Sequence, residues 1–457
     1  MANDWEVVKL KNAAQFFSGG TPPKSQPEYW GGDIPWISAK SMKGSRYHDS
    51  DLKLTEAGLK KGSRLAPKNS ILLLVRGSML HQKIPVGIAT KDVAFNQDVK
   101  AIIPNEKFLP LYFYYCFAGR ENEFLAKVEN TGIGAGKLDT DVLNKIEFYC
   151  PPIAEQKSIA HILGSLDDKI ELNRQMNDTL EAMAQALFKS WFVDFDPVID
   201  NALAAGNAIP DEFAERAEQR KGIEKKDNSN IQDLFPDEFE FTEEMGWIPK
   251  GWRMSPLTEV IDFLEGPGIR NWQYTEEEDG IKFINIRCIQ NGDIKLATAN
   301  KITKEEAFGK YEHFQLEVDD IVVSASGTLG RYAFVRKEHL PLSLNTSVIR
   351  FRPIGGISTL YYIAGYIDTT LQFELETRAT GSAQRNFGPM HLKQISMLLP
   401  PIDILDRHSE LAKRLFNKRK LNLEQIETLS KLRDTLLPKL MSGELRISDA
   451  EALVDEV

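Results

Sequence analysis

The sequence has few cysteines and no long apolar run. Its three cysteines, Cys116, Cys150 and Cys288, form no CxxC pair, so we expect neither a disulfide-built secreted domain nor a cysteine-based zinc site. No apolar stretch approaches the ~20 residues of a membrane-spanning helix. The opening residues, Met1-Ala2-Asn3-Asp4, do not resemble a signal peptide. These absences predict a cytoplasmic protein.

The sequence also lacks the patterns that bind nucleotides or carry out catalysis. The loop Thr131–Leu138 superficially resembles a phosphate cradle, but that pattern needs Gly at 131 and a hydroxyl at 138. A Pro-Pro pair follows Cys150 and another follows Leu399, without the amide and aromatic residues of an adenine methyltransferase motif. The seven histidines form no HExxH or nucleophile pair. We therefore expect no catalytic residue, no metal site and no cofactor in this chain.

The net charge of −10 argues at first against nucleic acid, but the charge is unevenly spread. Residues 1–150 carry +4, residues 251–400 carry −2, and residues 194–250 alone carry −9. The acidity therefore lies mostly in one connecting segment, and basic faces elsewhere remain compatible with nucleic acid. We expect Asp194 and Asp196 in that segment to form a turn with surface acids rather than a metal site.

Residues 151–193 carry the pattern of a long coiled-coil helix. Apolar residues recur there in steps of three and four, at Ile159, Leu163, Leu166, Ile170, Leu180, Leu187 and Trp191. Asn173 and Asn177 occupy the same seam, and a continuous helix of about 39 residues would be ~58 Å long.

This helical pattern occurs twice in the chain. Pro151, Pro152 and Ile153 return 249 residues later as Pro400, Pro401 and Ile402. The same offset relates four further pairs: Leu172 to Leu421, Asn173 to Asn422, Leu180 to Leu429 and Leu187 to Leu436. Because buried asparagines penalise slippage, we expect Asn173 and Asn422 to fix the register of two paired helices.

The preceding domains are repeated as well. Trp5 matches Trp252, Gly19 matches Gly266, and Asn96 matches Asn345. Short strands at Ile34–Ile37, Ser70–Val75 and Ile146–Tyr149, and a helix at Leu111–Phe117 opened by Pro110, predict a mixed α/β domain. The predicted order is a first globular domain (1–150), a long helix (151–193), an acidic, partly ordered connector (194–250), a second globular domain (251–400), a second long helix (401–447) and an acidic tail (448–457). The two helices are expected to pack as an antiparallel coiled coil with pseudo-twofold symmetry.

Two similar domains on paired helices favour recognition of a duplex at two half-sites. The polar and basic residues that differ between the two copies are the candidates, because Arg, Gln and Asn make bidentate base contacts whereas Lys and Ser mostly hold phosphates. His81 lies among them. The predicted DNA-binding residues are Thr21, Lys24, Lys40, Arg76, Ser78, Lys83, Gly134, Lys137, Arg270, Arg287, Ser326, Thr328, Arg331, Ser382, Gln384, Arg385 and Asn386.

The sequence resembles the DNA-specificity subunits of prokaryotic type I restriction-modification systems. The resemblance rests on Leu166–Pro197, on Ile248–Trp252 and on Leu432–Ile447. It implies double-stranded DNA as ligand, each domain reading one half of a bipartite site, and helices that act as a spacer and dock two modification (methyltransferase) subunits. It also implies restriction subunits as partners, with S-adenosylmethionine, ATP and Mg²⁺ carried by the partners. The outward helix residues Asp167, Asp168, Lys169 and Arg174 are candidate docking surface.

Two alternatives remain open at this point. A stand-alone methyltransferase or endonuclease would need methyl-donor and nuclease motifs, and we find neither in the sequence. A coiled-coil adaptor without DNA contact would fail to bind DNA even with partner subunits.

Overall fold

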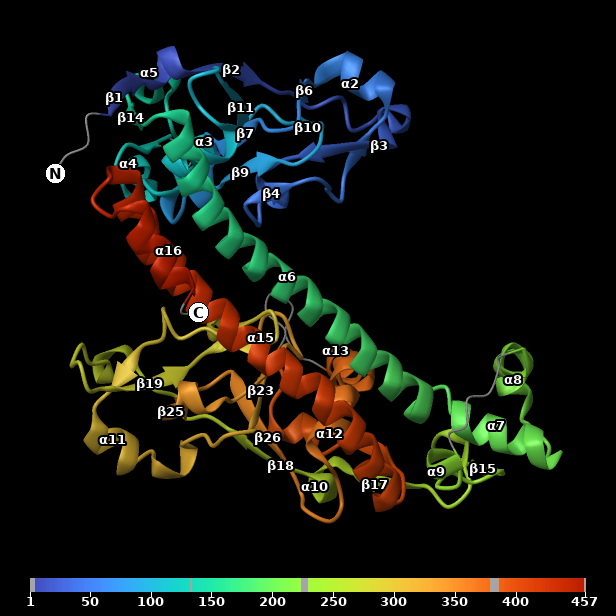
Figure 1. Cartoon of the computed structure of the whole chain (residues 1–457). Helices are drawn as coiled ribbons and strands as arrows, with labels where there is room; N and C mark the ends of the chain where they lie inside the picture. Colours follow the sequence, from blue (N-terminus) through green and yellow to red (C-terminus); the bar gives the residue numbers. More distant parts are fainter. Residues whose placement is uncertain (1–4, 132–133, 223–228, 379–385, 456–457) are drawn as a thin grey trace. The chain divides into compact units, whose positions relative to one another are not determined.

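The computed structural model describes residues 5–131, 134–222, 229–378 and 386–455 (Figure 1). The chain divides into two compact units. Unit 1 comprises Met1–Gln175 and Asn422–Val457, and unit 2 comprises Met176–Leu421. Each unit is described by itself below. Among the described residues, no helix is long and apolar enough to cross a membrane.

Unit 1 contains two main sheets. The first has the strand order β2-β11-β7-β9-β4, with bounds Ala14–Ser18, Val99–Pro104, Ile71–Leu74, Val86–Ala89 and Arg46–Tyr47. The second has the order β5-β3-β10-β6, with bounds Lys53–Leu54, Trp30–Ile37, Val93–Phe95 and Leu65–Ala66. Within it, β3 and β10 run parallel, so their carboxyl ends reach the same edge. A separate antiparallel pair joins β1 (Glu6–Lys9) to β14 (Glu147–Cys150).

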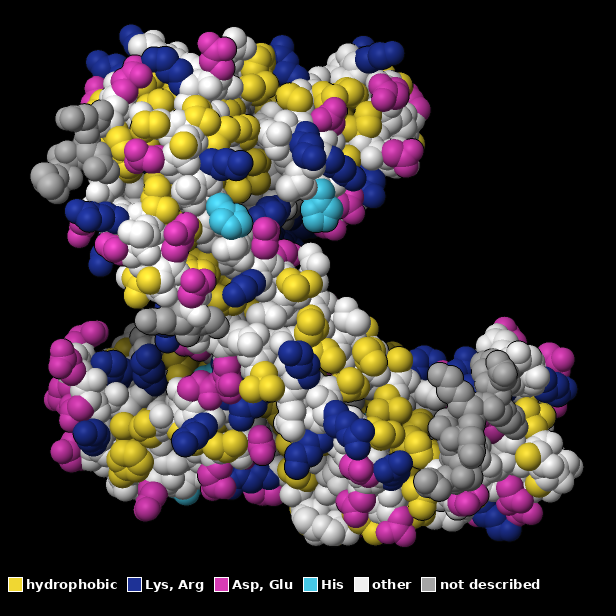
Figure 2. Space-filling view, in the orientation of Figure 1, with side chains coloured by type: hydrophobic (Ala, Val, Ile, Leu, Met, Phe, Trp, Pro, Cys, Tyr) yellow, Lys and Arg dark blue, Asp and Glu magenta, His cyan; other side chains and the backbone are white. Residues whose placement is uncertain are grey.

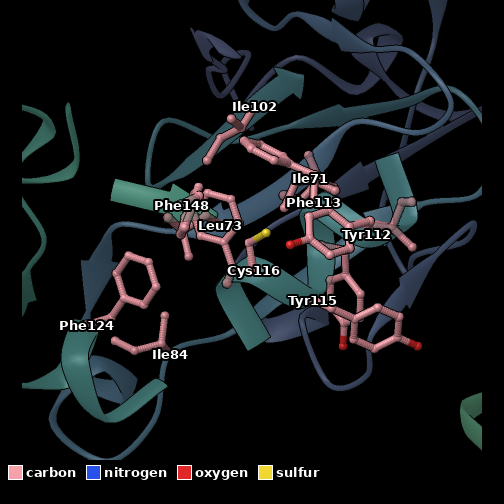
Figure 3. Close-up of a cluster of buried hydrophobic side chains, with 14 of the residues drawn as sticks. Ile71, Leu73, Ile84, Ile102, Tyr112, Phe113, Tyr115, Cys116, Phe124 and Phe148 are labelled. Carbon is pink, nitrogen blue, oxygen red and sulfur yellow. The ribbon is translucent and has the colours of Figure 1, made fainter. Parts of the chain in front are cut away.

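Helix α3 (Pro110–Ala118) supplies much of the core of unit 1. Proline suits the first turn of a helix because its missing N–H has no intrahelical acceptor there. The residues from Tyr112 to Phe117 are all buried. Phe113 packs edge-on against Phe148 of β14, with ring centroids 5.6 Å apart (Figure 3). Phe117 packs edge-on against the same ring, with centroids 5.1 Å apart. The predicted buried helix is confirmed.

Unit 2 repeats this plan. Its larger sheet has the order β18-β26-β23-β24, with bounds Ile261–Glu265, Val348–Pro353, Ile321–Ser324 and Tyr332–Phe334. Its smaller sheet has the order β22-β19-β25, with bounds Lys301–Ile302, Ile281–Ile284 and Leu342–Leu344, and again β19 and β25 run parallel. Strand β17 (Arg253–Pro256) pairs with β27 (Ser396–Leu399), and α12 (Leu360–Tyr366) takes the place of α3. The predicted tandem duplication of a mixed α/β domain is confirmed.

The two long helices are α6 (Ile153–Phe192) and α15 (Ile402–Ser442). In unit 1, Asp167 contacts Arg433 at 2.8 Å and Asn173 contacts Gln425 at 3.2 Å. In unit 2, Glu181 contacts Arg419 at 3.1 Å. Within unit 1, residue numbers rise along one helix as they fall along the other, so the helices pack antiparallel as predicted.

The seam of the helix pair differs in part from the prediction. Ile159, Leu163, Leu166 and Ile170 are buried as expected. Trp191 is buried as well, whereas Leu180 and Leu187 are only partly buried. The repeated pair Leu172 and Leu421, which the seam pattern does not include, is 59% and 55% exposed.

Of the two predicted register residues, only Asn422 is fully buried. Asn173 is partly exposed and donates from Nδ2 to Oε1 of Gln425. The role of Asn173 and Asn422 in fixing the register stays a prediction.

Asp167 was predicted to face outward, and this prediction is wrong. Its side chain is only 7% exposed, because it accepts hydrogen bonds from the Tyr115 hydroxyl at 2.7 Å and from Arg433 Nη1 at 2.8 Å. Its neighbour Asp168 is exposed and pairs with Arg46 at 2.5 Å. Lys169 and Arg174 are exposed as predicted.

The described residues of the segment 194–250, which leave out 223–228, form more regular structure than predicted. The segment contains α7 (Asp196–Ala205), α8 (Ala214–Lys221) and a hairpin of β15 (Phe239–Thr242) and β16 (Gly246–Pro249). Asp196 is not a surface acid, since it is 3% exposed and is held by Arg216 Nε at 2.7 Å and by the Ser190 hydroxyl at 2.7 Å. The charge that compensates Asp196 lies twenty residues downstream, which the local sequence pattern does not reveal.

The predicted acidic tail is also helical. Helix α15 ends at Ser442, and α16 (Ile447–Asp455) follows it with Ala450 buried. Ala450 belongs to the core of unit 1 together with Leu10 and Phe113. Helix α16 therefore contributes to the core of unit 1.

The buried imidazole of His408 predicts an acid-sensitive unit 2. His408 is 1% exposed and packs against Phe192 with ring centroids 4.9 Å apart, and this burial lowers its pKa from 6.5 to about 3. Between these values the unfolded chain binds a proton that the folded chain does not, so stability falls as pH falls, with a slope of up to ~1.4 kcal/mol per pH unit. The substitution His408→Phe is expected to remove this loss in urea-unfolding measurements between pH 4 and 7.

Asp368, whose pKa is shifted in the opposite direction from that of His408, provides a matched control. Burial raises the pKa of Asp368 from 3.8 to about 6, so this carboxyl binds a proton in the folded chain first and opposes the effect of His408. Asp368→Asn should therefore steepen the acid loss. An unchanged pH dependence in His408→Phe would contradict the assignment.

Candidate nucleic-acid interface

Several loops of unit 1 meet at one end of its sheets. Backbone hydrogen bonds join Asn96 N to Ile37 O at 2.9 Å, Val75 N to Asp98 O at 2.8 Å, and Leu138 N to Val75 O at 2.9 Å. These bonds bring together the segments that follow β3, β7 and β10. We call the resulting surface edge 1, formed by residues 19–24, 38–43, 75–83, 96–98 and 134–138.

The two loops that differ most between the repeats are paired as strands in edge 1. β8 (Arg76–Gly77) pairs with β13 (Gly136–Lys137), which places Arg76 opposite Lys137, and β13 also pairs with β12 (Glu129–Asn130). A ring nitrogen of His81 lies 3.2 Å from the Gly134 carbonyl oxygen. Both loops contain predicted DNA-binding residues, and the structure brings these residues together.

The glycine-rich sequence of Thr131–Leu138 predicts a flexible, exposed loop, and among its described residues this prediction is wrong for Gly136. Gly136 is buried, and a Cβ atom there would lie 2.9 Å from side-chain carbons of Leu80 and Val128. Only glycine allows this close approach. Gly134, at φ +76°, is exposed. Gly132 and Ile133 lie outside the described residues.

The charges of edge 1 are only partly compensated. Lys137 pairs with Asp139 at 2.6 Å, and this hydrogen bond raises the pKa of Lys137. Arg76, Ser78 and Lys83 are exposed in the same segment. This gives edge 1 a cation at Arg76 directly beside the paired Lys137.

The remaining candidates of unit 1 reach the same edge from its other side. The Thr21 hydroxyl donates to Gln97 Oε1 at 2.7 Å, which ties loop 19–24 to the segment after β10. The backbone at Gly19 packs directly against Phe95 of β10, since a Cβ atom at Gly19 would lie 2.0 Å from the Phe95 carbonyl oxygen. Lys24 and Lys40 are exposed on the two neighbouring segments.

Unit 2 forms the corresponding surface, edge 2, from residues 266–272, 285–288, 325–331, 345–347 and 386–388. Backbone hydrogen bonds join Ala325 N to Ser347 O at 2.8 Å, Phe387 N to Ala325 O at 3.0 Å, and Thr346 N to Pro267 O at 2.9 Å. Ser326 bridges to Asn386 where unit 1 has Arg76 opposite Lys137. The architecture is shared, and the side chains differ.

Most of the described candidates of unit 2 are accessible. Exposed side chains are those of Arg270, Arg287, Thr328, Arg331 and Asn386. Arg331 Nη2 also donates to the Ile286 carbonyl at 3.4 Å, next to Arg287. Ser326 is only 5% exposed, so its position is better suited to support the edge than to contact a ligand. Ser382, Gln384 and Arg385 lie outside the described residues.

Sequence reasoning missed Gln97 in edge 1 and both Thr346 and Trp272 in edge 2. Gln97 and Thr346 follow the strands β10 and β25, whose ends reach the edges only because they pair in parallel with β3 and β19. Asn96 and its repeat Asn345 directly precede Gln97 and Thr346 in the sequence. Only the strand pairing shows that these two residues lie at the edges.

On the side of the molecule drawn in Figure 2, the surface is not uniformly basic. Figure 2 shows Lys and Arg side chains interspersed with Asp and Glu on the side in view. Among the described residues, no three His, Cys, Asp or Glu side chains come together as a metal-binding group. The exposed candidate side chains of the two edges are hydrogen-bonding and cationic groups.

Comparison with known proteins accounts for this arrangement. The profile of the type I restriction modification DNA specificity domain matches the chain twice, over residues 2–182 and 249–431. The chain belongs to the type I restriction-modification DNA specificity family. The two matched segments coincide with the duplicated domain and most of the long helix that follows it.

Relatives agree with this family, and a solved structure shares the fold. The MjaIX specificity subunit of Methanocaldococcus jannaschii is 27% identical over 98% of this chain and 94% of its own length. The HindI specificity subunit of Haemophilus influenzae is 25% identical over 85% of this chain and 87% of its own length. The crystal structure of a type I S subunit from M. genitalium shares the fold, with a TM-score of 0.53 at 15% identity over 96% of this chain and 98% of that one.

Membership in this family implies sequence-specific DNA recognition. It also agrees with the expectation that the chain is a non-catalytic specificity subunit. The resemblance drawn from the sequence is thereby confirmed.

Proposed function

We propose that edge 1 and edge 2 each read one half of a bipartite DNA site. The observation that carries this proposal is the repetition of one loop architecture with different side chains at its centre. At equivalent positions, unit 1 has Arg76 opposite Lys137 and unit 2 has Ser326 opposite Asn386. Because the donors and acceptors differ, two different half-site sequences are the expected outcome.

The long helices set the gap between the half-sites and dock the partner subunits in this proposal. The exposed helix residues Asp168, Lys169 and Arg174 remain candidates for docking, whereas the buried Asp167 no longer does. The partners are two modification (methyltransferase) subunits and the restriction subunits, acting on double-stranded DNA. S-adenosylmethionine, ATP and Mg²⁺ would be bound by those partners and not by this chain.

The direct test is co-expression with a type I modification subunit, followed by sequencing of the methylated adenines in host DNA. A bipartite motif with a fixed gap is the expected result. A stable complex that methylates no such motif would instead favour an adaptor without DNA recognition.

Paired substitutions test which edge reads which half. Arg76→Ala should relax one position of one half-site by about 10- to 100-fold, because a bidentate arginine contact discriminates bases by ~1–3 kcal/mol. Arg331→Ala should relax the other half-site and leave the first unchanged. Methylation motifs of the two variants, compared with wild type, provide the measurement, and relaxation of the same half by both variants would contradict the assignment.

A further inference from the structure

Trp272 is the most exposed large hydrophobic side chain among the described residues, at 80%. The buried Trp36 and Trp252, at 4% and 3%, show how this chain treats tryptophans that serve its cores. An indole left in water at this extent contributes little to folding and offers a large apolar surface to a partner.

The backbone that carries Trp272 is firmly held. It lies in the 3₁₀ turn Asn271–Gln273, where Arg270 N donates to Gln273 Oε1 at 3.0 Å. The Gln273 side chain is 7% exposed, and its Nε2 donates to Glu306 Oε1 and to the Tyr311 hydroxyl, each at 2.9 Å. The turn is therefore fixed on its buried side, which preorganises the exposed indole for contact.

Trp272 also belongs to edge 2. Ile269 N donates to Asn345 Oδ1 at 3.2 Å, which ties the segment before the turn to the segment after β25. Arg270, an exposed cation, is two residues away. A cation beside an accessible aromatic ring matches the surface of DNA, which presents phosphates next to apolar sugar and base atoms.

Unit 1 has no matching aromatic residue. The corresponding 3₁₀ turn of unit 1 is Pro27–Tyr29, and its middle residue, in the place of Trp272, is Glu28. The duplicated fold therefore does not require a tryptophan here, and the residue serves something that differs between the two units. The half-site sequence is such a difference.

We propose that Trp272 packs its indole against the DNA of the half-site read by edge 2. This inference rests on the function proposed above and adds an apolar contact to it. The indole covers sugar or base atoms while Arg270 faces the phosphates. The half-site read by edge 1 lacks this contact.

The test measures DNA affinity of the complex of the full chain with its modification subunits. Two duplexes are compared: the methylated motif, and the same duplex with the half-site of edge 2 scrambled. Trp272→Ala should weaken binding to the motif by about tenfold, as expected for loss of one aromatic stacking contact. It should change binding to the scrambled duplex by much less, and Trp272→Phe should retain most of the affinity.

Phe241→Ala is the matched control. Phe241 is 63% exposed in unit 2, on the β15–β16 hairpin next to Trp247, and it is not part of edge 2. This variant should bind both duplexes as wild type does, and neither alanine substitution should change the melting temperature. Unchanged affinity in Trp272→Ala, or an equal loss on both duplexes, would overturn the proposal.

The two hypotheses fail in different ways. If the wild-type complex bound the motif and the duplexes scrambled in either half with equal affinity, bipartite recognition itself would be contradicted. If the wild-type complex discriminated between these duplexes and the Trp272→Ala variant did so equally well, only the contact assigned to Trp272 would be contradicted.

Discussion

Lengthening both long helices by one turn is expected to change the gap between the half-sites while leaving their sequences intact. Four residues add ~6 Å of helix, which corresponds to about two base pairs of DNA. They also rotate the helix by about 40° beyond a full turn, close to the ~35° between successive base pairs. The methylated motif of such a variant should therefore keep both halves and gain one or two base pairs between them.

The structure shows where these insertions belong. The division between the two units crosses α6 at Gln175 and α15 at Leu421. Helix-forming residues added after both positions leave the contacts inside each unit intact, including Asp167 with Arg433 and Glu181 with Arg419. An insertion in α6 alone forces α15 out of register, so this control should lose methylation. A doubly lengthened variant that still methylates the original gap would rule out the helices as the spacer.

The second large effect is expected from Asp167→Ala in unit 1. This substitution removes the acceptor of the buried Tyr115 hydroxyl and the partner of Arg433. Breaking a buried ion pair costs ~3–5 kcal/mol, and we expect about 3 kcal/mol because the Arg433 side chain, 27% exposed, reaches water. For a unit of this size, the melting temperature should fall by roughly 6–12 °C.

Tyr115→Phe is the control for Asp167→Ala, because it removes only the hydroxyl and should cost about 1 kcal/mol. Calorimetry or chemical unfolding of the full chain provides the measurement. A loss below ~0.5 kcal/mol in Asp167→Ala would show that Asp167 behaves as the surface residue suggested by its sequence position.

Asp167 also shows why parts of this fold were beyond sequence reasoning. The spacing of Ile159, Leu163, Leu166 and Ile170 defines one buried stripe, and Asp167 lies just beside it. A charged residue beside such a stripe normally faces water. Here the side chain of Tyr115, 52 residues earlier, covers it. The periodicity of a helix predicts which face packs on another helix but not which further residues a neighbouring domain buries.

The duplication, by contrast, was accessible because it needs no knowledge of contacts. Gly19 and Gly266 stand out as equivalent glycines, and the structure shows each pressed against the backbone, at Phe95 and at Asn345. The loops after Val75 and before Leu138 could be nominated from their divergence between repeats. Their meeting in edge 1 depends on pairing between strands distant in sequence, which single-sequence patterns do not encode.

Unit 1 is built from two segments that lie far apart in the sequence, and this has a consequence for synthesis of the protein. Its core unites Leu10 and Phe113 with Leu436, Leu440 and Ala450, so residues 1–150 lack part of their core until residues 436–450 have been synthesised. At ~5–20 residues per second, that delay is roughly 15–60 s. Unit 2 is contiguous in sequence and can close earlier. A nascent chain that stalls before residue 440 would expose apolar surface to chaperones and proteases, so quality control would act on incomplete copies before they could assemble.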